Sequence, residues 1–319
     1  MNLTKLIGGP PDSKEVHFPE DLKGWTRKGF SLAVLGNPIG HSISPVIHNA
    51  ALSEMTSLDP EFADWRYFRF KVPLQRLQEC LPEFANRGFR GLNLTIPHKV
   101  DALGMIDWVD PEAALIGAVN TLVFNANGRC EGFNTDGYGL ERAVEEEFGF
   151  TLDGASVILL GAGGAARAAA TRILRSGCSE LWIGNRSKER LTLLIQTLVV
   201  GPGQRVETFA LSDAPPDLPH GSGVLLINAT SLGLNPEDGA PLDLSNFATG
   251  TIVYDMIYNP VETALLRAAR KHGMRTANGM SMLVHQAARS LEIWTDAEVP
   301  TEPMFVAAKK ALGMQGESV

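Results

Sequence analysis

The sequence predicts an α/β protein with two domains. Short apolar runs alternate with amphipathic stretches along most of the chain, and such alternation is typical of a mostly parallel sheet flanked by helices. A glycine-rich turn joins an apolar run to an Ala-rich stretch within residues 156–177, which predicts a Rossmann-like unit. The length of 319 residues suffices for roughly two domains.

The first half of the chain predicts alternating strands and helices after an irregular start. Residues 1–29 contain Gly, Pro and charges without a continuous apolar core, and predict a loose arm. Ser44 is the expected N-cap of the first helix, with Pro45 at its first position. We expect strands over 30–36, 65–72 and 89–96, and helices over 44–55 and 74–88.

A second unit begins near Ser156 with a strand, the glycine-rich turn and the Ala-rich helix. Its later apolar runs are short and predict buried strands, and the last strong pattern is helical. We expect strands over 180–185, 223–231 and 251–258, a helix over 261–273, a short run over 274–279 and a final helix over 281–294.

Composition indicates a globular protein, with 44% hydrophobic and 20% charged residues. A formal net charge of -8 without a Lys/Arg cluster argues against nucleic acid as a partner. An anionic ligand would therefore need local groups to attract it. The three cysteines are far apart, which indicates a reducing, cytoplasmic compartment. We expect no membrane span, and no cluster of His, Cys and carboxylate residues predicts a metal.

The turn after the first strand of the second unit has the spacing of a dinucleotide-binding loop. Gly161 permits the tight turn, Gly163 lets the backbone approach a pyrophosphate, and Ala166 keeps the helix close to the strand. The helix N-terminus favours an anion there. The alternative is a glycine turn that only packs. The expected cofactor contacts are Gly161, Ala162, Gly163, Gly164 and Ala165.

The end of the next strand predicts NADP rather than NAD. The fingerprint usually places an acid there to bind a ribose hydroxyl, whereas this sequence has Asn185, Arg186, Ser187 and, slightly later, Arg190. An acid would repel a 2′-phosphate, and an Arg can bind it with two parallel hydrogen bonds. The alternative is a solvated pair of surface arginines.

The first unit carries polar residues at two expected helix starts. Ser42 and Ser44 could share a carboxylate, although Ser44 alone is explained as a helix cap. Lys99 follows Pro97 in the expected first turn of a helix, where the macrodipole disfavours a cation. Proton transfer by Lys99 would explain that placement. An exposed Lys whose side chain extends away from the helix end is the alternative.

Four further residues are candidates for ligand contacts. Asp136 precedes a helical run and is either a helix cap or a partner for Lys99. Asn120 offers a neutral donor and acceptor for a polyol. Met282 and Gln286 are four residues apart in a predicted helix and therefore share a face. A solvent-facing Gln is the alternative for the last.

Taken together, these stretches resemble the shikimate dehydrogenase family. The matches run in the family order from about residue 33 to residue 295, and so many motifs in order are specific although several are weak singly. The motifs are GNPIGHSISPVIHNAAL, GLNLTIPHK, GAVNT, GFNTDGYG, GAGGAAR, NRSKER, INATSLG, YDMIYNP and NGMSMLVHQAA.

The resemblance implies an NADPH-dependent, reversible reduction of 3-dehydroshikimate to shikimate, on the route to chorismate and the aromatic amino acids. It implies that Lys99 and Asp136 are catalytic. Implied substrate contacts are Ser42 and Ser44 for the carboxylate and Asn93, Thr95, Asn120 and Gln286 for the ring hydroxyls. Implied cofactor contacts are Asn185, Arg186, Ser187 and Arg190 at the adenosine phosphate, with Gly279 and Met282 near the nicotinamide.

The family fold implies a substrate-binding domain over 30–137 and 278–319, and a Rossmann-like NADP-binding domain over 138–277. The expected partner is a small-molecule substrate, and the expected state is a monomer or homodimer. A quinate/shikimate dehydrogenase with relaxed cofactor choice is the near alternative, and the intact Asn93 and Thr95 favour the shikimate-specific enzyme. A non-catalytic NADP- or metabolite-sensing module is the alternative of a different class.

Overall fold

The structure, a computed structural model, describes residues 15–215 and 217–314. The described chain divides into two compact units. Unit 1 takes residues 15–110, 118–133 and 290–314, and unit 2 takes 111–117 and most of 134–289. Both units are α/β, as the sequence predicts.

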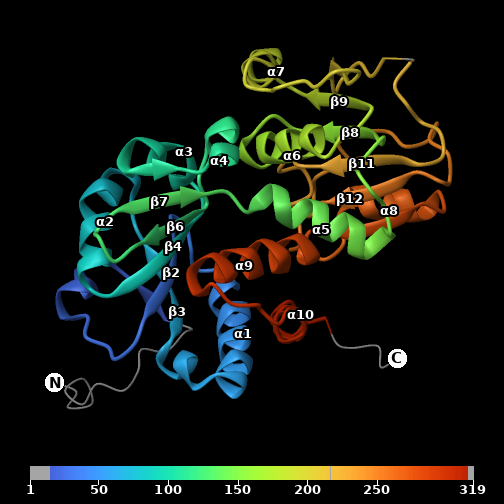
Figure 1. The fold of residues 1–319 in the computed structure, drawn as a ribbon. Coiled ribbons are helices and arrows are strands. Elements are labelled where there is room, and N and C mark those ends of the chain that lie inside the picture. Colours follow the sequence, from blue (N-terminus) through green and yellow to red (C-terminus); the bar gives the residue numbers. More distant parts are fainter. Residues whose placement is uncertain (1–14, 216, 315–319) are drawn as a thin grey trace. The chain divides into compact units, whose positions relative to one another are not determined.

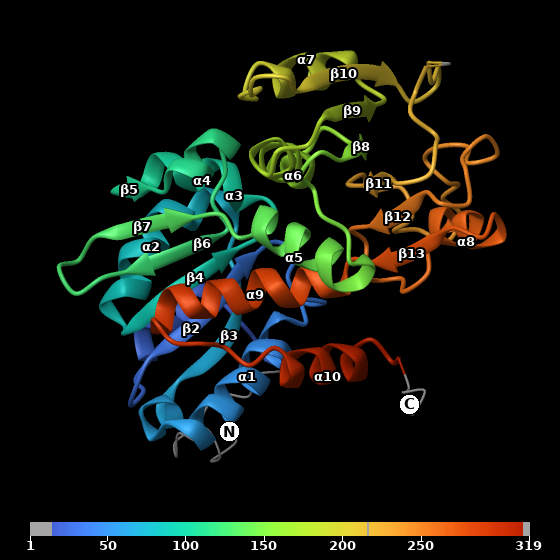
Figure 2. The same cartoon turned by 45° about the vertical axis from the view of Figure 1, so that its right-hand side comes forward.

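Within the described residues, the sheet of unit 1 has seven strands in the order β1-β3-β2-β4-β6-β7-β5. The central strands run parallel, whereas β6 is antiparallel to both β4 and β7. Figures 1 and 2 show β6 and β7 as a hairpin beside β4. The strands are β1 (Val16–His17), β2 (Ser31–Gly36), β3 (Arg66–Lys71), β4 (Phe89–Leu94), β5 (Trp108–Val109), β6 (Thr121–Phe124) and β7 (Cys130–Phe133).

Helices cover the sheet of unit 1 because their apolar faces need burial. Helix α1 packs on β3 and on α10, and buries Ile47, Leu52 and Met55. Helix α2 buries Leu77, Leu81 and Phe84. The α-helices of this unit are α1 (Ser44–Leu58), α2 (Leu77–Asn86), α3 (His98–Asp101) and α10 (Glu302–Ala311), and its 3-10 helices are η2 (Pro19–Gly24), η3 (Pro60–Asp64), η4 (Leu74–Arg76) and η5 (Ala102–Met105).

The expectation of a loose arm over residues 1–29 is wrong for its described part. Strand β1 pairs with β3 as a parallel edge strand. Leu22 is 2% exposed, and the Trp25 ring contacts the rings of Phe68, Phe70 and Phe89. Residues 1–14 lie outside the described chain. The sequence pattern hid this packing because only a few separated side chains of the segment are buried.

Six strands, again counting only described residues, form the sheet of unit 2 in the order β10-β9-β8-β11-β12-β13. All of them are parallel and in regular register. This order reverses direction beside β8, and ligands of such sheets bind at the carboxyl ends of the strands at that point. The strands are β8 (Ser156–Leu160), β9 (Glu180–Asn185), β10 (Arg205–Ala210), β11 (Val224–Asn228), β12 (Ile252–Asp255) and β13 (Arg275–Asn278).

Two apolar layers cover the two faces of this sheet. One layer packs α5, α6 and α7 through residues such as Leu140, Ile173 and Leu191, and the other packs α8 through Leu265 and Leu266. The sheet is therefore doubly wound. The helices of unit 2 are α4 (Pro111–Ile116), α5 (Asp136–Phe148), α6 (Gly164–Arg175), α7 (Lys188–Ile195), α8 (Ala264–Lys271) and the larger part of α9 (Met280–Thr295).

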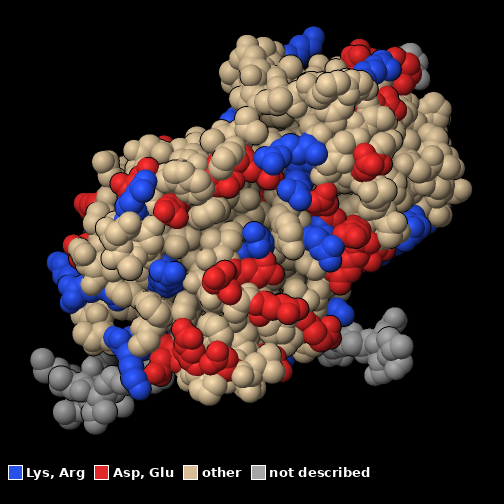
Figure 3. Space-filling view, in the orientation of Figure 1, with Lys and Arg blue, Asp and Glu red and all other residues tan. Residues whose placement is uncertain are grey.

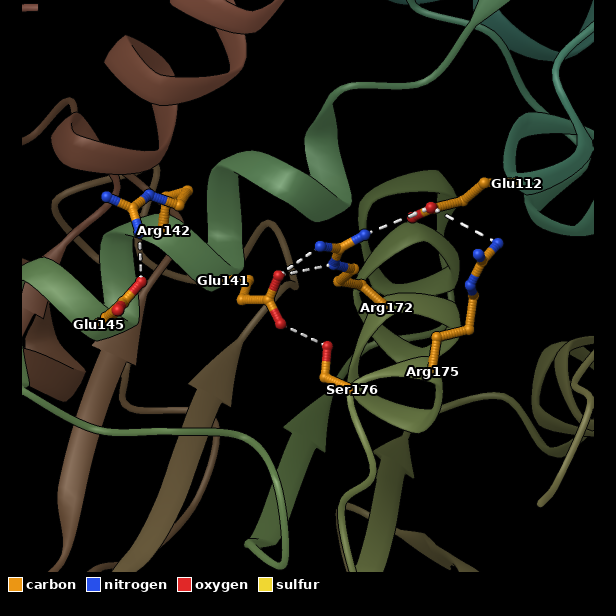
Figure 4. A network of polar contacts seen from close by, with 7 residues as sticks. All are labelled: Glu112, Glu141, Arg142, Glu145, Arg172, Arg175 and Ser176. Carbon is orange, nitrogen blue, oxygen red and sulfur yellow. Dashed lines mark hydrogen bonds and ion pairs between the residues drawn. The ribbon is translucent and has the colours of Figure 1, made fainter.

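A polar network joins three helices of unit 2 (Figure 4). Arg172 of α6 donates through Nε to Glu141 of α5 at 2.8 Å and through Nη1 to Glu112 of α4 at 3.3 Å. Arg175 also lies 3.5 Å from Glu112, and Ser176 Oγ donates to Glu141. The arrangement attaches the short α4 to α6 by shared charges. Across the described chain, each helix is too short or too polar to span a lipid bilayer.

Candidate functional site

The glycine turn of unit 2 is open at the start of a twelve-residue helix. Gly161 has φ 120°, and a Cβ there would lie 2.8 Å from the Ala229 carbonyl oxygen, so only glycine fits. Gly163 is the N-cap of α6, and a Cβ added at Gly163 or Gly164 would meet nothing within 4 Å. The first N–H groups of α6 thus have room for an anion, which fits a dinucleotide pyrophosphate.

The segment after β9 presents two exposed arginines, Arg186 and Arg190. Ser187 caps α7, because its Oγ accepts a hydrogen bond from Arg190 N at 3.2 Å and donates to Glu189 at 2.7 Å. Asn185 Nδ2 donates to the Ser187 carbonyl at 3.0 Å. Asn185 and Ser187 therefore shape the segment, and the two guanidinium groups are the cations that fit a phosphate.

A loop stretching beyond β11 lies near Arg186. Asp238 accepts hydrogen bonds from Gly233 N at 2.9 Å and Asn235 N at 3.0 Å. These bonds, with a smaller contribution from the Arg186 charge, lower the pKa of the Asp238 carboxyl. Asp238 thus fixes the shape of the loop after β11 beside Arg186, one of the predicted cofactor contacts.

A buried carboxylate network, which the sequence analysis missed, joins the ends of β11 and β12. Asp255 is 0% exposed and accepts from Asn228 Nδ2 at 3.0 Å, Ile257 N at 3.1 Å and Thr263 Oγ1 at 2.6 Å. Thr263 also caps α8, and Asn228 Oδ1 accepts from Thr230. Burial raises the pKa of Asp255 despite these bonds. An Asp in an otherwise apolar strand was the available signal.

Close packing surrounds the predicted nicotinamide contacts. A Cβ at Gly279 would lie 2.0 Å from the Met256 carbonyl oxygen, so the chain requires glycine there. Met282 and Gln286 lie on α9, as predicted, and both contact α5, since a Cβ at Gly139 would lie 2.8 Å from the Met282 carbonyl oxygen and from Gln286 Cβ. Gln286 Nε2 donates to the Leu283 carbonyl at 2.8 Å.

Asp136 is the first residue of α5, and the N-cap is Thr135 rather than Asp136. Its backbone N–H donates to Asn134 Oδ1 at 3.0 Å, and the residue is 7% exposed. A carboxylate in the first turn is favoured by the macrodipole. Asp136 therefore does not serve as the helix cap that was its alternative interpretation.

The serine pair of unit 1 differs from the prediction. The N-cap of α1 is Ile43, Ser44 is the first helical residue and Pro45 the second, and no side chain caps the helix. Ser42 Oγ instead accepts from Ser44 N at 3.3 Å. The expectation of Ser44 as N-cap is therefore wrong: the helix starts one residue earlier, at Ser44 itself, and Ser42 supplies the acceptor beside this start. Both hydroxyls remain at the carboxyl end of β2.

Lys99 lies on a shorter helix than the sequence suggests. Helix α3 has four residues, with Pro97 as N-cap after a cis Ile96–Pro97 peptide. A helix of one turn has only a small macrodipole, so the dipole argument for Lys99 weakens. The backbone is nevertheless fixed, since Val119 N donates to the Lys99 carbonyl at 2.8 Å. The preceding His98 is 0% exposed, and burial lowers its pKa.

The predicted polyol contacts Asn93 and Asn120 belong to a buried network. Asn93 Nδ2 donates to the Asn120 carbonyl at 3.0 Å, to Thr121 Oγ1 at 3.1 Å and to Ser290 Oγ at 3.0 Å, while its Oδ1 accepts from Tyr67 at 2.7 Å. Asn120 Oδ1 accepts from Thr121 Oγ1 at 2.9 Å. Asn93 therefore organises the sheet, whereas Thr95 directly follows β4 and is partly exposed.

These features define a two-domain α/β protein with a dinucleotide-type turn, and comparison with known proteins gives its family. Residues 34–122 match the model described as the shikimate dehydrogenase substrate binding domain, and residues 279–304 match the shikimate 5'-dehydrogenase C-terminal domain. The shikimate dehydrogenase (NADP(+)) of Moorella thermoacetica is 39% identical over 283 residues, which are 88% of this chain and 93% of that protein.

Two solved structures share the fold. Shikimate 5-dehydrogenase of Thermus thermophilus, solved with NADP(H) and shikimate, has a TM-score of 0.76 and 36% identity over 89% of this chain and 100% of that one. Quinate dehydrogenase of Corynebacterium glutamicum, solved with NAD, has a TM-score of 0.77 and 28% identity over 88% and 98%. The chain belongs to the shikimate dehydrogenase family.

Proposed function

We propose that this protein reduces 3-dehydroshikimate to shikimate with NADPH, reversibly, as a step of chorismate and aromatic amino acid biosynthesis. The observation that carries the proposal is the 39% identity to a shikimate dehydrogenase (NADP(+)) over 88% of this chain. By resemblance, Lys99 and Asp136 match the family's reactive pair. The open glycine turn supports the cofactor. We assign substrate binding to the domain over residues 30–137 and 278–319, and NADP binding to the domain over residues 138–277.

When bound, NADPH supplies a hydride to the C3 carbonyl carbon of the substrate. As the oxygen gains negative charge, the Lys99 ammonium stabilises it and donates the proton. In oxidation, neutral Lys99 accepts the hydroxyl proton. Asp136, the first residue of α5, accepts a hydrogen bond from the neighbouring substrate hydroxyl.

The remaining residues bind and orient. Ser42 and Ser44 donate hydrogen bonds to the substrate carboxylate, and Thr95, Asn120 and Gln286 contact the ring hydroxyls. Asn93, whose amide is engaged within unit 1, supports these contacts by fixing β4 against β6. Gly279 and Met282 lie at the nicotinamide.

We further propose that Arg186 and Arg190 bind the 2′-phosphate of NADP, with Asn185 and Ser187 fixing the segment that carries them. The absence of an acid at the end of β9 favours this choice over NAD. The pyrophosphate contacts are the turn residues Gly161, Ala162, Gly163, Gly164 and Ala165.

A second candidate is quinate dehydrogenation, which the likeness to the quinate dehydrogenase favours. The intact Asn93 and Thr95 support shikimate as the better substrate.

Cys80, Cys130 and Cys178 are buried free thiols, and burial raises the pKa of each, to about 11, 12 and 11. Thiols of this kind suit a reducing cytoplasm.

Incubating the protein with NADPH and 3-dehydroshikimate tests the proposal. We expect loss of NADPH absorbance matched by formation of shikimate, identified by chromatography against a standard. Lys99→Ala is the control for a contaminating activity. If NADP binds but neither shikimate nor quinate is turned over, the protein is a sensing module and the proposed function is wrong.

A further inference from the structure

Strand β3 carries a buried cation that no assigned role uses. Arg69 is 8% exposed, and its Nη1 donates to the Gly40 carbonyl at 2.7 Å and to the Ser42 carbonyl at 3.0 Å. A buried charge is costly unless polar groups surround it. Two of the compensating groups are carbonyls of the loop between β2 and α1, the loop that carries Ser42 and leads into Ser44.

These two contacts fix the direction of two peptide groups in that loop. The 40–41 and 42–43 peptides are trans, so each N–H points opposite to its carbonyl. Because the carbonyls of Gly40 and Ser42 point at Arg69, the N–H groups of His41 and Ile43 point away from it. Backbone N–H groups turned away from the buried cation are available to attract an anion.

The net charge of the protein does not attract an anionic substrate. The formal net charge is -8, and on the face in Figure 3 the Lys and Arg side chains are dispersed among Asp and Glu. Ser42 and Ser44 supply neutral donors. The Arg69 guanidinium contacts the loop that carries Ser42, and the residue is buried. Salt screens a buried charge less than an exposed one, so this charge can still act on a ligand of the loop.

We propose that Arg69 is a positioning and specificity-determining residue for the substrate carboxylate. It holds the loop of residues 39–44 with its carbonyls turned inward, and its charge favours a carboxylate over a neutral group at Ser42 and Ser44. The inference rests on the proposed function, because it takes the carboxylate of shikimate as the group that this loop binds.

The test compares shikimate with its neutral methyl ester in two variants. Arg69→Gln keeps a hydrogen-bond donor and loses the charge, and Arg69→Lys keeps the charge and loses the planar fork. We expect Arg69→Gln to lower the ratio of kcat/KM for shikimate over the ester about tenfold, which corresponds to about 1.4 kcal/mol. The KM for NADP and the kcat with shikimate should stay within about twofold. Arg69→Lys should raise KM for both substrates and retain the ratio.

Arg66→Met is the matched control, because Arg66 is an exposed arginine of the same strand. An unchanged ratio in Arg69→Gln, or an equal loss for both substrates, overturns the proposal. If Arg69→Gln does not fold, as thermal melting will show, Arg69→Lys decides: unchanged KM values overturn the positioning role. A wild type inactive on shikimate defeats the proposed function and this inference together, whereas an active wild type with an unaffected variant defeats the inference alone.

Discussion

Two loops present polar groups in different ways: residues 161–163, which follow β8 in unit 2, and residues 37–43, which follow β2 in unit 1. The glycine turn offers backbone N–H groups, and its shape requires glycine at Gly161, while Gly163 leaves open space at the start of α6. The serine loop depends on Arg69, which comes from another strand. A loop whose shape depends on its own residues can be recognised from the sequence, whereas a loop held by a residue of another strand can be recognised only from the structure.

The same contrast holds for the groups that react. Lys99 lies in a one-turn helix held by a bond from Val119, whereas the predicted phosphate contacts stand at the ends of regular parallel strands and helices. Substitutions at Lys99 and Asp136 should act mainly on catalysis, and those at Arg186 and Arg190 on cofactor choice.

The largest expected effect is that of Lys99→Ala. We expect kcat to fall by about 10²–10⁴-fold, the range for losing a positioned acid–base group. The substrate Kd should change less, because the carboxylate contacts remain. Steady-state kinetics and calorimetric binding measure the two quantities, and a kcat within threefold of wild type would remove Lys99 from the mechanism.

Asp255→Ala should cost stability rather than chemistry. It leaves Asn228, Ile257 N and Thr263 without their buried acceptor, and breaking such a network costs roughly 3–5 kcal/mol. Denaturant unfolding measures the loss. Asp255→Asn, which keeps one acceptor, should recover more than half of it, and equal losses in both variants would show that hydrogen bonding is not what matters there.

Arg186→Ala should weaken NADP binding by at least tenfold, since a charge-assisted hydrogen bond contributes roughly 1.5–3 kcal/mol. NAD should be little affected, and the double variant with Arg190→Ala should show the larger switch. The ratio of kcat/KM for NADP over NAD, at fixed low salt, is the readout. Arg142→Ala, an exposed arginine of α5, is the control. An unmoved ratio in the double variant contradicts the assignment.

Ser42 and Ser44 should differ in how much each contributes to stability. Ser42→Ala removes the acceptor for Ser44 N and should cost roughly 0.5–1.5 kcal/mol of stability, the net contribution of one hydrogen bond. Ser44→Ala should cost less. Both should raise KM for shikimate. Thermal melts and kinetics test this order, and the reverse order of stabilities would restore Ser44 as the cap.

The smallest expected effect is a pH dependence from His98. Burial lowers its pKa in the folded protein below 6.5, so the unfolded chain binds the proton first and stability is lost as pH falls below about 6.5. The slope is at most about 1.4 kcal/mol per pH unit. Unfolding of His98→Phe between pH 5 and 7 should show a smaller slope than wild type. An equally reduced slope in His220→Phe, at an exposed position, would remove the assignment to burial.

Apolar periodicity predicted β2, β3, β4, β8, β9, β11 and β12 and the helices α1, α2, α6, α8 and α9, but not β10, α7, α10 or the β6–β7 hairpin. The glycine turn between β8 and α6 predicted the Rossmann-like sheet of unit 2. What could not be predicted depends on contacts distant in sequence. Asp255 is the single charge of strand β12 and Arg69 is the buried one of three cations in β3, and only the folded chain shows which loop each one holds. The packing of Trp25 against Phe68 was hidden for the same reason. The catalytic roles came from family resemblance rather than from spacing.

The most direct test of the account is the set of kcat/KM values for shikimate and quinate, each with NADP and with NAD, measured on the wild type under one buffer. We expect shikimate with NADP to be the best pair, and kcat/KM with NADP to exceed kcat/KM with NAD by at least tenfold, because of the arginines after β9. Quinate with NAD equal to or better than shikimate with NADP would contradict it.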